Sequence, residues 1–340
     1  MNLRYGVRLL LTGCAVSGVL AGCGAPNGVS PSAGSHTISA GFAPRAWMKP
    51  GASQGALLYA TGYFNCGYNI PYTCVFAYPS GEQVGALAVG DTSLCSDSKG
   101  NVFIPDKYNE SVLEYAHGGT EPIADLGDPG YRPVSCSVAP KSDDLAVFNA
   151  CAQASNFYCI GPGSIAVYRH AKGNPTQYQG GDIYWYSYGG YDGSGNVFVQ
   201  GIGPSPSDSF TFEELPHGGS SLTPLTLDRV PNSPGQVQWD GSAMTIEDQY
   251  PPAIYRLKIS GSNATVVGET HFRGKSIAIG PTWIQGNTVV VPYGRRGKSD
   301  KFVGLWRYPK GGKATLRIVN GFVSKLRGFD GVTVSVGLNL

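Results

Sequence analysis

Short stretches of alternating apolar and polar residues, separated by turns rich in Gly, Asn and Asp, recur along most of this chain. In five places a polar turn leads directly into an apolar strand, after residues 98–101, 141–144, 193–196, 240–242 and 285–287. A two-residue period is typical of β-strands, and the repeating segments show no helical period. The pattern predicts an all-β domain.

A second short motif occurs six times: an aromatic or apolar residue is followed by a few polar residues and then by Gly. Its copies are 76–81, 113–118, 167–173, 214–218, 255–261 and 306–311, at intervals of roughly 37 to 53 residues. Four strands per interval predict a six-bladed β-propeller of four-stranded blades, each running A-B-C-D outward from a central channel. A β-sandwich with a second domain is the alternative, because similar turns occur in sandwiches.

The first blade begins with a B-like strand at 56–61 and has no inner strand of its own. The C-terminal segment 332–336 is expected to supply that strand and close the ring. Closure would hide two sheet edges that otherwise promote aggregation. The inner strands are expected at 93–96, 134–138, 189–191, 236–239, 276–279 and 331–336.

One segment of the repeat carries a resemblance to a known superfamily. The run Asp97-Ser-Lys-Gly-Asn-Val-Phe-Ile-Pro-Asp106, followed by Ser111-Val-Leu-Glu-Tyr115, resembles the repeat of NHL/YncE-like propellers in the lactonase-like superfamily. The resemblance covers residues 56–340 and implies the propeller fold. Because members include lactonases, lyases and binding scaffolds, it does not select a function.

The N-terminus has the features of an export signal. Arg4 and Arg8 precede an apolar run of about 12 residues, which is shorter than the roughly 20 that a transmembrane helix needs. The run ends in Leu20-Ala-Gly-Cys23, which resembles the lipobox of bacterial lipoproteins and implies cleavage of residues 1–22 and acylation of Cys23, with palmitate among the chains. An ordinary secretory signal and an uncleaved anchor are the alternatives.

The expected domain order follows from these signals. Residues 23–55 are rich in Gly, Ser, Pro and Ala and are expected to form a flexible tether between the lipid and a propeller at 56–340. Two acyl chains give a stable membrane anchor. Gly24 stands where some enteric bacteria place an acidic retention signal, so the outer membrane, on its periplasmic face, or the cell surface is the expected location.

Cysteine usage fits an oxidising compartment. Of eight cysteines, Cys14 leaves with the signal and Cys23 carries lipid, so six remain. Two pairs are each eight residues apart, and the last two lie at equivalent places in two inner strands. The expected bonds are Cys66–Cys74, Cys151–Cys159 and Cys95–Cys136. No CxxC or histidine spacing indicates a metal site, and no cofactor is predicted.

Composition excludes one class of partner. Charged residues make up 14% of the chain, the net charge is +2 and the sequence pI is about 8.0. Nucleic-acid binding normally requires a basic stripe or a domain pI above about 9, so no nucleic acid is expected. His117, His170 and His217 occupy the same place in the repeat and are expected to be turn residues spread around the outer rim.

Candidate binding residues fall on the loops that share one rim of the propeller, where propeller sites commonly lie. An aromatic run could stack on sugar rings or pack between blades. A second set, of acidic, basic and aromatic residues, could serve acid-base chemistry. A third set, a basic loop, could bind an anionic glycan or lipid headgroup. For both sets the alternative is a loop that is only exposed to solvent. The candidates are Asp106, Lys107 and Tyr108; Asp182, Tyr184, Trp185 and Tyr186; Glu247, Asp248 and Tyr250; and Arg295 and Arg296.

No nucleophile elbow, phosphate loop or dinucleotide fingerprint is present, so no catalytic residue is assigned. We expect a lipid-anchored binding or scaffold module without catalytic activity, with a glycan or an envelope protein as partner. One alternative is a metal-dependent, lactonase-like hydrolase or lyase, with a divalent cation held by Asp106, Asn149, Glu247 or Asp248. Another is an envelope-assembly scaffold that presents an apolar patch to a protein.

Overall fold

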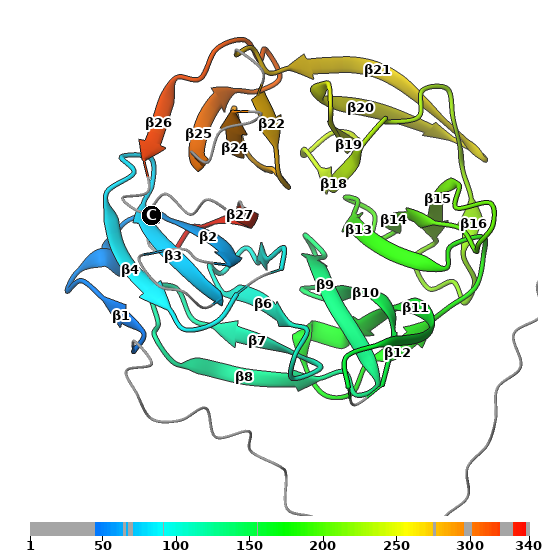
Figure 1. The fold of residues 1–340 in the computed structure, drawn as a ribbon, viewed down its shortest axis with the longest axis horizontal. Helices are drawn as coiled ribbons and strands as arrows, with labels where there is room; N and C mark the ends of the chain where they lie inside the picture. Colours follow the sequence, from blue (N-terminus) through cyan, green and yellow to red (C-terminus); the bar gives the residue numbers. More distant parts are fainter. Residues whose placement is uncertain are drawn as a thin grey trace, which may run out of the picture. The chain divides into compact units, whose positions relative to one another are not determined.

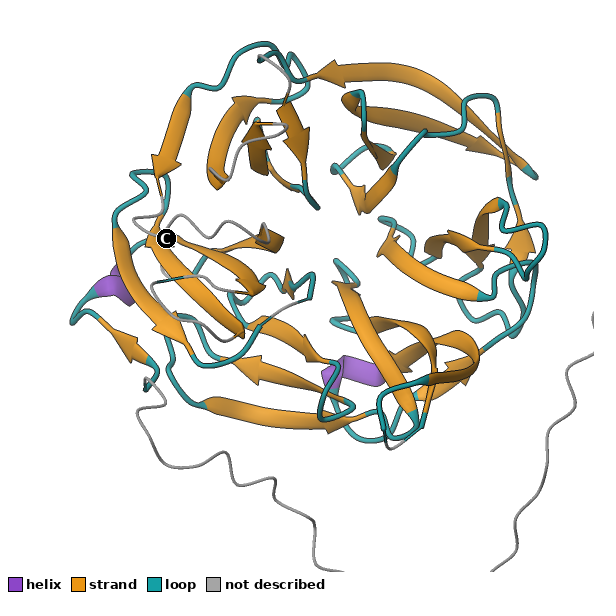
Figure 2. Cartoon of the chain, viewed as in Figure 1, coloured by secondary structure: helices purple, strands orange, loops and turns teal. Residues whose placement is uncertain are grey.

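Strands account for nearly all of the regular structure and form six sheets around a central axis (Figure 1). The computed structural model describes residues 45–63, 66, 71–90, 92–154, 156–274, 277–295, 301–319 and 329–337. Two short 3-10 segments, η1 (Ala52–Gln54) and η2 (Arg169–Ala171), accompany the strands (Figure 2). Within these ranges no helix is long and apolar enough to cross a membrane.

The six sheets are the blades of a propeller, which confirms the predicted fold. Blade I contains, from the channel outward, β27 (Phe329–Ser335), β2 (Leu57–Tyr63), β3 (Pro71–Ala77), β4 (Gln83–Leu87) and β1 (Trp47–Met48). Blade II contains β5 (Cys95–Ser96), β6 (Val102–Asp106), β7 (Ser111–Tyr115) and β8 (Pro122–Gly127). Blade III contains β9 (Tyr131–Val138), β10 (Leu145–Gln153), β11 (Cys159–Tyr168) and β12 (Thr176–Tyr178).

The remaining blades follow the same order. Blade IV contains β13 (Trp185–Tyr191), β14 (Val197–Ile202), β15 (Phe210–Leu215) and β16 (Thr223–Pro224). Blade V contains β18 (Pro234–Trp239), β19 (Met244–Gln249), β20 (Pro252–Ser260), β21 (Asn263–His271) and β17 (Thr226–Leu227). Blade VI contains β22 (Ile277–Ile279), β24 (Thr288–Arg295), β25 (Lys301–Arg307) and β26 (Leu316–Val319), with β23 (Trp283–Gln285) paired to β24.

The C-terminal strand closes the ring as predicted. β27 pairs antiparallel with β2, from Leu57 opposite Ser335 to Thr61 opposite Gly331. The first blade also extends further toward the N-terminus than the sequence indicates, because β1 pairs with β4 through Trp47 opposite Ala86. Residues 47–54, placed in the tether by composition, therefore belong to the propeller.

The predicted inner strands are found in all six blades, with one difference in blade VI. There the inner position is divided between β22, which pairs with the end of β24, and β23, which pairs with its beginning through Trp283 opposite Val290. The sequence predicts only the first of these two strands. Gly280 and Pro281 separate them, and the break hides the continuous apolar run by which a strand is recognised.

Hydrophobic residues fill the spaces between neighbouring blades. Each of six buried clusters combines side chains of two adjacent blades, as where Phe148 of blade III packs with Val199 of blade IV. Strands in the middle of a blade face a neighbour on both sides. For this reason consecutive residues of β2, such as Leu57 and Leu58, are both fully buried and read as a continuous apolar run.

All three predicted disulfides are present. Cys66–Cys74 and Cys151–Cys159 are local links, and Cys95–Cys136 joins the inner strands β5 and β9 of neighbouring blades. The Cα atoms of Cys95 and Cys136 are 5.6 Å apart, within the range that a disulfide requires. This third bond covalently connects blades II and III beside the channel.

Candidate binding site at the C-terminal mouth of the channel

Each end of the propeller channel opens into a cavity. Residues at the beginnings of inner strands, such as Ser93 and Arg132, line one cavity, and residues at their ends, such as Ser137 and Trp239, line the other. We call these ends the N-terminal mouth and the C-terminal mouth. The hydroxyl of Ser93 donates a hydrogen bond across the channel to Oε1 of Gln236 at 3.4 Å. Ser93 lines the cavity at the N-terminal mouth, and Gln236 lines the cavity at the C-terminal mouth.

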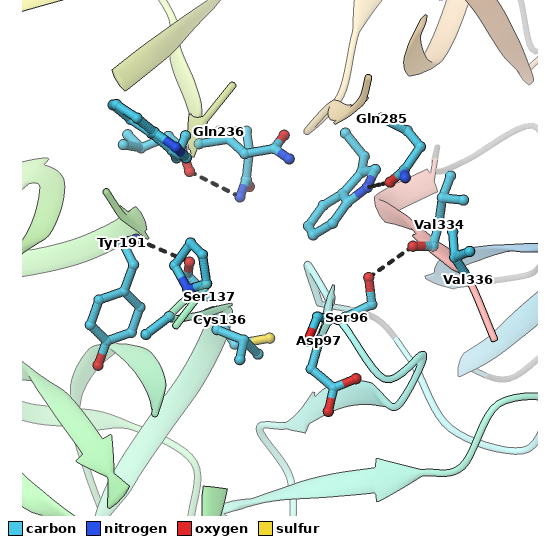
Figure 3. Close-up of a pocket in the computed structure, with 17 residues that line it drawn as sticks. Ser96, Asp97, Cys136, Ser137, Tyr191, Gln236, Gln285, Val334 and Val336 are labelled. Carbon is cyan, nitrogen blue, oxygen red and sulfur yellow. Dashed lines mark hydrogen bonds between the residues drawn. The ribbon is translucent and has the colours of Figure 1, made fainter. Parts of the chain in front are cut away.

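The cavity at the C-terminal mouth has a volume of about 370 Å³ and lies between the ends of the inner strands. This volume is within the range of small-molecule sites. Figure 3 shows Gln236 and Gln285 on one side of the cavity, with Ser96 and Cys136 on the other.

Two tryptophans from neighbouring blades line this cavity. Trp239 ends β18 and Trp283 begins β23, and both side chains are partly exposed. Gly193 leaves the room that Trp239 occupies, because a Cβ atom there would lie 3.3 Å from the indole ring. Trp283 packs against the hydrophobic cluster that contains Cys95 and Cys136 of the opposite blades. Both rings are thus fixed by packing while part of each remains accessible.

Amide and hydroxyl groups surround the two rings. Gln238 holds β23 in place, since its Nε2 donates to the Ile284 carbonyl at 3.0 Å and its Oε1 accepts from the Ile284 amide at 2.8 Å. The Trp283 indole N–H donates to Oε1 of Gln285 at 3.2 Å. The Ser96 hydroxyl donates to the Val334 carbonyl at 2.9 Å (Figure 3). These bonds orient polar side chains around the cavity on a rigid backbone.

The cavity carries little charge. Of the 17 residues that line it, Asp97 is the one with an ionisable carboxylate, and no lysine, arginine or histidine is among them. The Asp97 side chain accepts hydrogen bonds from the amides of Lys99 and Asn101 and from the Asn101 side chain, so it is used to form a turn. A neutral, partly apolar lining with many amide and hydroxyl groups favours an uncharged polar ligand.

The sequence-predicted rim residues are distributed over several environments. Asp106 ends β6, where its carboxylate accepts hydrogen bonds from the Tyr108 amide at 3.1 Å and from the Asn109 side chain at 2.7 Å. Lys107 lines the cavity at the N-terminal mouth. Tyr108 is 45% exposed and makes an edge contact with Phe157, with ring centroids 5.9 Å apart. Of these three neighbours, Lys107 is the one that faces the channel cavities described above.

The aromatic run on β13 is divided by the alternation of the strand. Tyr186 is buried between blades III and IV, and its hydroxyl donates to the Gly180 carbonyl at 3.0 Å. Trp185 is 37% exposed and contacts Tyr184 edge to face. Asp182 lies outside this cluster, with its amide donating to Oε1 of Glu213. Tyr186 therefore has the packing role that was the alternative interpretation for this run.

Glu247 and Asp248 are adjacent in β19 but face opposite sides of the blade. Glu247 is buried against blade VI, where its Oε2 accepts a hydrogen bond from the Thr282 amide at 2.9 Å. Burial raises the pKa of Glu247 to about 7, although this hydrogen bond opposes the shift. Asp248 accepts hydrogen bonds from the amides of Ser233 and Tyr250, both at 3.0 Å.

The other rim candidates do not complete a site. Tyr250 is 49% exposed. Arg295 is the last residue of β24, and Arg296 lies outside the described residues. The structure thus places the acidic candidates Asp106, Glu247 and Asp248 in separate surroundings.

The side chains required by the metal-dependent alternative do not converge. Asp106 and Asp248 are used in the turns described above, and Asn149 donates to Oδ2 of Asp128 at 2.7 Å. The described part of the chain holds no group of three or more His, Cys, Asp or Glu side chains placed to hold a metal ion. Two of the histidines expected to be dispersed, His170 and His217, in fact line one cavity of about 320 Å³ between blades III and IV.

No functional role was predicted from the sequence for Trp239 or Trp283. Trp239 belongs to a predicted inner strand, but Trp283 follows the Gly280-Pro281 break and was assigned to no strand. A signal was available, because Trp239 directly precedes the turn at 240–242 and Trp283 lies two residues before the turn at 285–287 of the next blade.

No protein-family model matches the sequence, and no curated protein matches it. Among solved structures, similarity extends to a protein of unknown function from Bacteroides caccae, with 12% identity over 83% of this chain and 99% of that one, at a TM-score of 0.57. A chain of a nidogen/laminin complex has 12% identity over the same shares, at a TM-score of 0.59. TolB from Acinetobacter baumannii has 10% identity over 84% of this chain and 68% of its own, at a TM-score of 0.53. At such identities the similarity shows the fold alone, a six-bladed β-propeller.

Proposed function

We propose that this protein is an exported, lipid-anchored propeller that binds a neutral glycan at the C-terminal mouth and carries out no chemistry on it. Export and anchoring rest on the lipobox-like motif that ends at Cys23. The binding role rests on the cavity between the ends of the inner strands.

One observation carries the glycan assignment: Trp239 and Trp283 line the same cavity together with amide and hydroxyl side chains. Sugar rings present both C–H faces and hydroxyl groups. The C–H faces pack on indole rings, and the hydroxyls pair with groups such as Gln236 and Gln285. A cavity of about 370 Å³ accommodates one or two sugar units.

The lining also explains why binding is proposed without hydrolysis. Glycosidases use two carboxyl groups about 5 to 9.5 Å apart, one on each side of the scissile bond. This cavity offers only Asp97, whose oxygens are occupied by the turn that follows it. A bound glycan would therefore meet no acid-base pair.

Binding can be tested on an array of neutral oligosaccharides, followed by calorimetry with the oligosaccharide that binds best. Trp239→Ala and Trp283→Ala are each expected to weaken binding about fivefold or more, because an aromatic contact contributes roughly 1 kcal/mol or more. Trp185→Ala is the matched control, since this tryptophan is exposed outside the cavity. The absence of any neutral ligand, or equal losses in all three variants, would count against the proposal.

The membrane anchor has its own test. Radiolabelled palmitate should enter the wild-type protein and not a Cys23→Ser variant. Labelling that persists in the variant would show that the lipobox-like motif is not the acylation site.

Protein binding is a second candidate function, favoured by exposed apolar side chains in the loop before β11 and at the start of that strand. Phe157 and Tyr158 are 46% and 71% exposed, and Ile160 is 69% exposed, beside the Cys151–Cys159 disulfide. Exposed apolar groups held on a constrained loop are typical of protein contacts. Crosslinking from Tyr158 in intact cells would recover a specific envelope protein if this role is correct and a background pattern if it is not.

A further inference from the structure

The N-terminal mouth holds a second cavity, to which every blade contributes. Its volume is about 500 Å³. Its lining includes Asp330 from blade I, Ser93 from blade II, Arg132 from blade III, Tyr188 from blade IV, Gln249 from blade V and Pro281 from blade VI. Residues far apart in the sequence thus surround one space on the propeller axis, on the other side of the Ser93–Gln236 hydrogen bond from the proposed glycan cavity.

Arg132 is a half-buried cation in the lining of this cavity, which also contains the carboxylate of Asp330. Its guanidinium makes no hydrogen bond or ion pair with any residue that the structure describes. Two carboxylates close to Arg132 in the sequence are used in other contacts: Asp128 accepts from Asn149 and Gln177, and Glu110 accepts from the Gly130 amide at 2.8 Å. A guanidinium presents several donors in one plane, a geometry that matches a carboxylate through two parallel hydrogen bonds.

Tyr188 supplies a second donor that the protein does not use. Its hydroxyl makes no hydrogen bond within the described part of the chain, although the residue lines the cavity. Burial raises the pKa of Tyr188 far above its ordinary value, and the nearby Glu247 and Asp330 carboxyls act in the same direction. The hydroxyl therefore keeps its proton at physiological pH and can donate it to an acceptor.

The charges of the lining limit the ligand further. Lys107 and Arg132 bring two positive charges into the cavity, and Asp330 brings one negative charge. A singly charged carboxylate brings the sum of these charges to zero, whereas a phosphate with two negative charges would leave an uncompensated negative charge beside Asp330. The hydroxyl of Ser93 and the amide of Gln249 add polar contacts for an oxygen-rich ligand.

We propose that the N-terminal mouth binds a small organic carboxylate, with the Arg132 guanidinium as its main contact and the Tyr188 hydroxyl as a second donor. This site is independent of the proposed glycan cavity at the opposite mouth. It gives the propeller two ligands of different chemistry, one neutral and one anionic.

The test uses the full oxidised protein and four named probes: acetate, lactate, glutamate and glucuronate. Ligand-observed NMR and calorimetry should show millimolar or tighter binding of at least one probe. Glucose serves as the uncharged partner of glucuronate, and inorganic phosphate as the multiply charged comparison. Arg132→Gln should weaken binding at least about tenfold, as expected for the loss of hydrogen bonds to a charged group, and Tyr188→Phe should weaken it less.

Two further variants keep the result interpretable. Arg132→Lys retains the positive charge but lacks the planar guanidinium, so it should bind carboxylates more weakly than wild type. This variant provides the comparison if Arg132→Gln does not fold. Trp239→Ala should bind the probes normally, which separates this site from the glycan cavity. The proposal is overturned if none of the four probes binds, if phosphate binds more tightly than all of them, or if wild type and both Arg132 variants bind equally.

Discussion

Replacing Glu247 with glutamine should make the protein less sensitive to alkaline pH. The Glu247 side chain is 1% exposed, and its burial raises the carboxyl pKa from the ordinary 4.5 to about 7. Each pKa unit corresponds to about 1.4 kcal/mol, so a shift of this size is equivalent to about 3 kcal/mol of stability. The isosteric glutamine carries no ionisable proton and should lack this pH-dependent contribution.

The sign follows from the order of the two pKa values. Below pH 4.5 the Glu247 carboxyl is protonated in both the folded and the unfolded states, so it has no differential effect. Between pH 4.5 and about 7 the folded protein retains a proton that the unfolded chain has lost, and stability therefore falls as pH rises. Above pH 7 both states are ionised, and the whole cost of the buried charge is present.

Urea unfolding of the oxidised protein at pH 4.5, 6 and 8, followed by tryptophan fluorescence, measures this difference. Relative to wild type, Glu247→Gln should gain about 3 kcal/mol between pH 4.5 and pH 8. Other buried acids, such as Asp128 and Glu213, contribute equally to both proteins and cancel in the comparison. Parallel stability curves for the two proteins would refute the assignment of this pH dependence to Glu247.

Blade IV provides the reverse experiment. Gln200 is the fourth residue of β14, as Glu247 is of β19, and its Nε2 donates to the Gly235 carbonyl at 3.3 Å. A glutamine is thus accommodated at this repeat position. Gln200→Glu would place a carboxyl against that carbonyl oxygen in a site 3% exposed, so stability should fall steeply as the new group ionises.

Two predictions concern the closure of the propeller. Removing Cys95–Cys136, which spans 41 residues, should lower the free energy of unfolding in urea by about 4 kcal/mol. Removing Cys66–Cys74, which spans eight residues, should lower it by about 2.5 kcal/mol, because the shorter loop restricts the unfolded chain less. Equal losses would contradict this dependence on loop length. Val334→Asp puts a charge into the closing strand at a side chain 2% exposed and should cost more than about 3 kcal/mol, whereas Val267→Asp, at a position 55% exposed, should change stability by less than about 0.5 kcal/mol. Similar melting temperatures for these two variants would show that β27 does not hold the ring closed.

Much of the fold could be predicted from the sequence because its signals are local and repeated. A turn such as 193–196 followed by Val197-Phe-Val specifies a strand without reference to distant residues. Disulfide pairing followed from the equivalent places of Cys95 and Cys136 in the repeat. The short strand β1 was missed because two residues give no period, and its partner β4 is more than thirty residues away.

The candidate site was much harder to predict because it depends on side-chain direction. Neighbours on one strand point to opposite faces, so Glu247 and Asp248 enter different environments although they are adjacent in the sequence. The axial cavity at the N-terminal mouth combines residues from all six blades. Arg132 has no distinguishing motif, and only the structure shows that it lines this cavity and forms no ion pair with the residues described.

The differences between blades are therefore more informative about function than the features that they share. Equivalent apolar positions form the packing between blades and explain why a chain can remain a propeller at 10 to 12% identity to other propellers. The channel mouths are formed where inner strands begin and end, and there the blades differ, with Arg132 at one end and Trp239 at the other. Because every inner strand reaches the axis, one substitution at such a position alters a shared cavity without disturbing the packing between blades. For this reason ligand specificity can change faster than the fold, and the strand ends are the positions at which it should be sought.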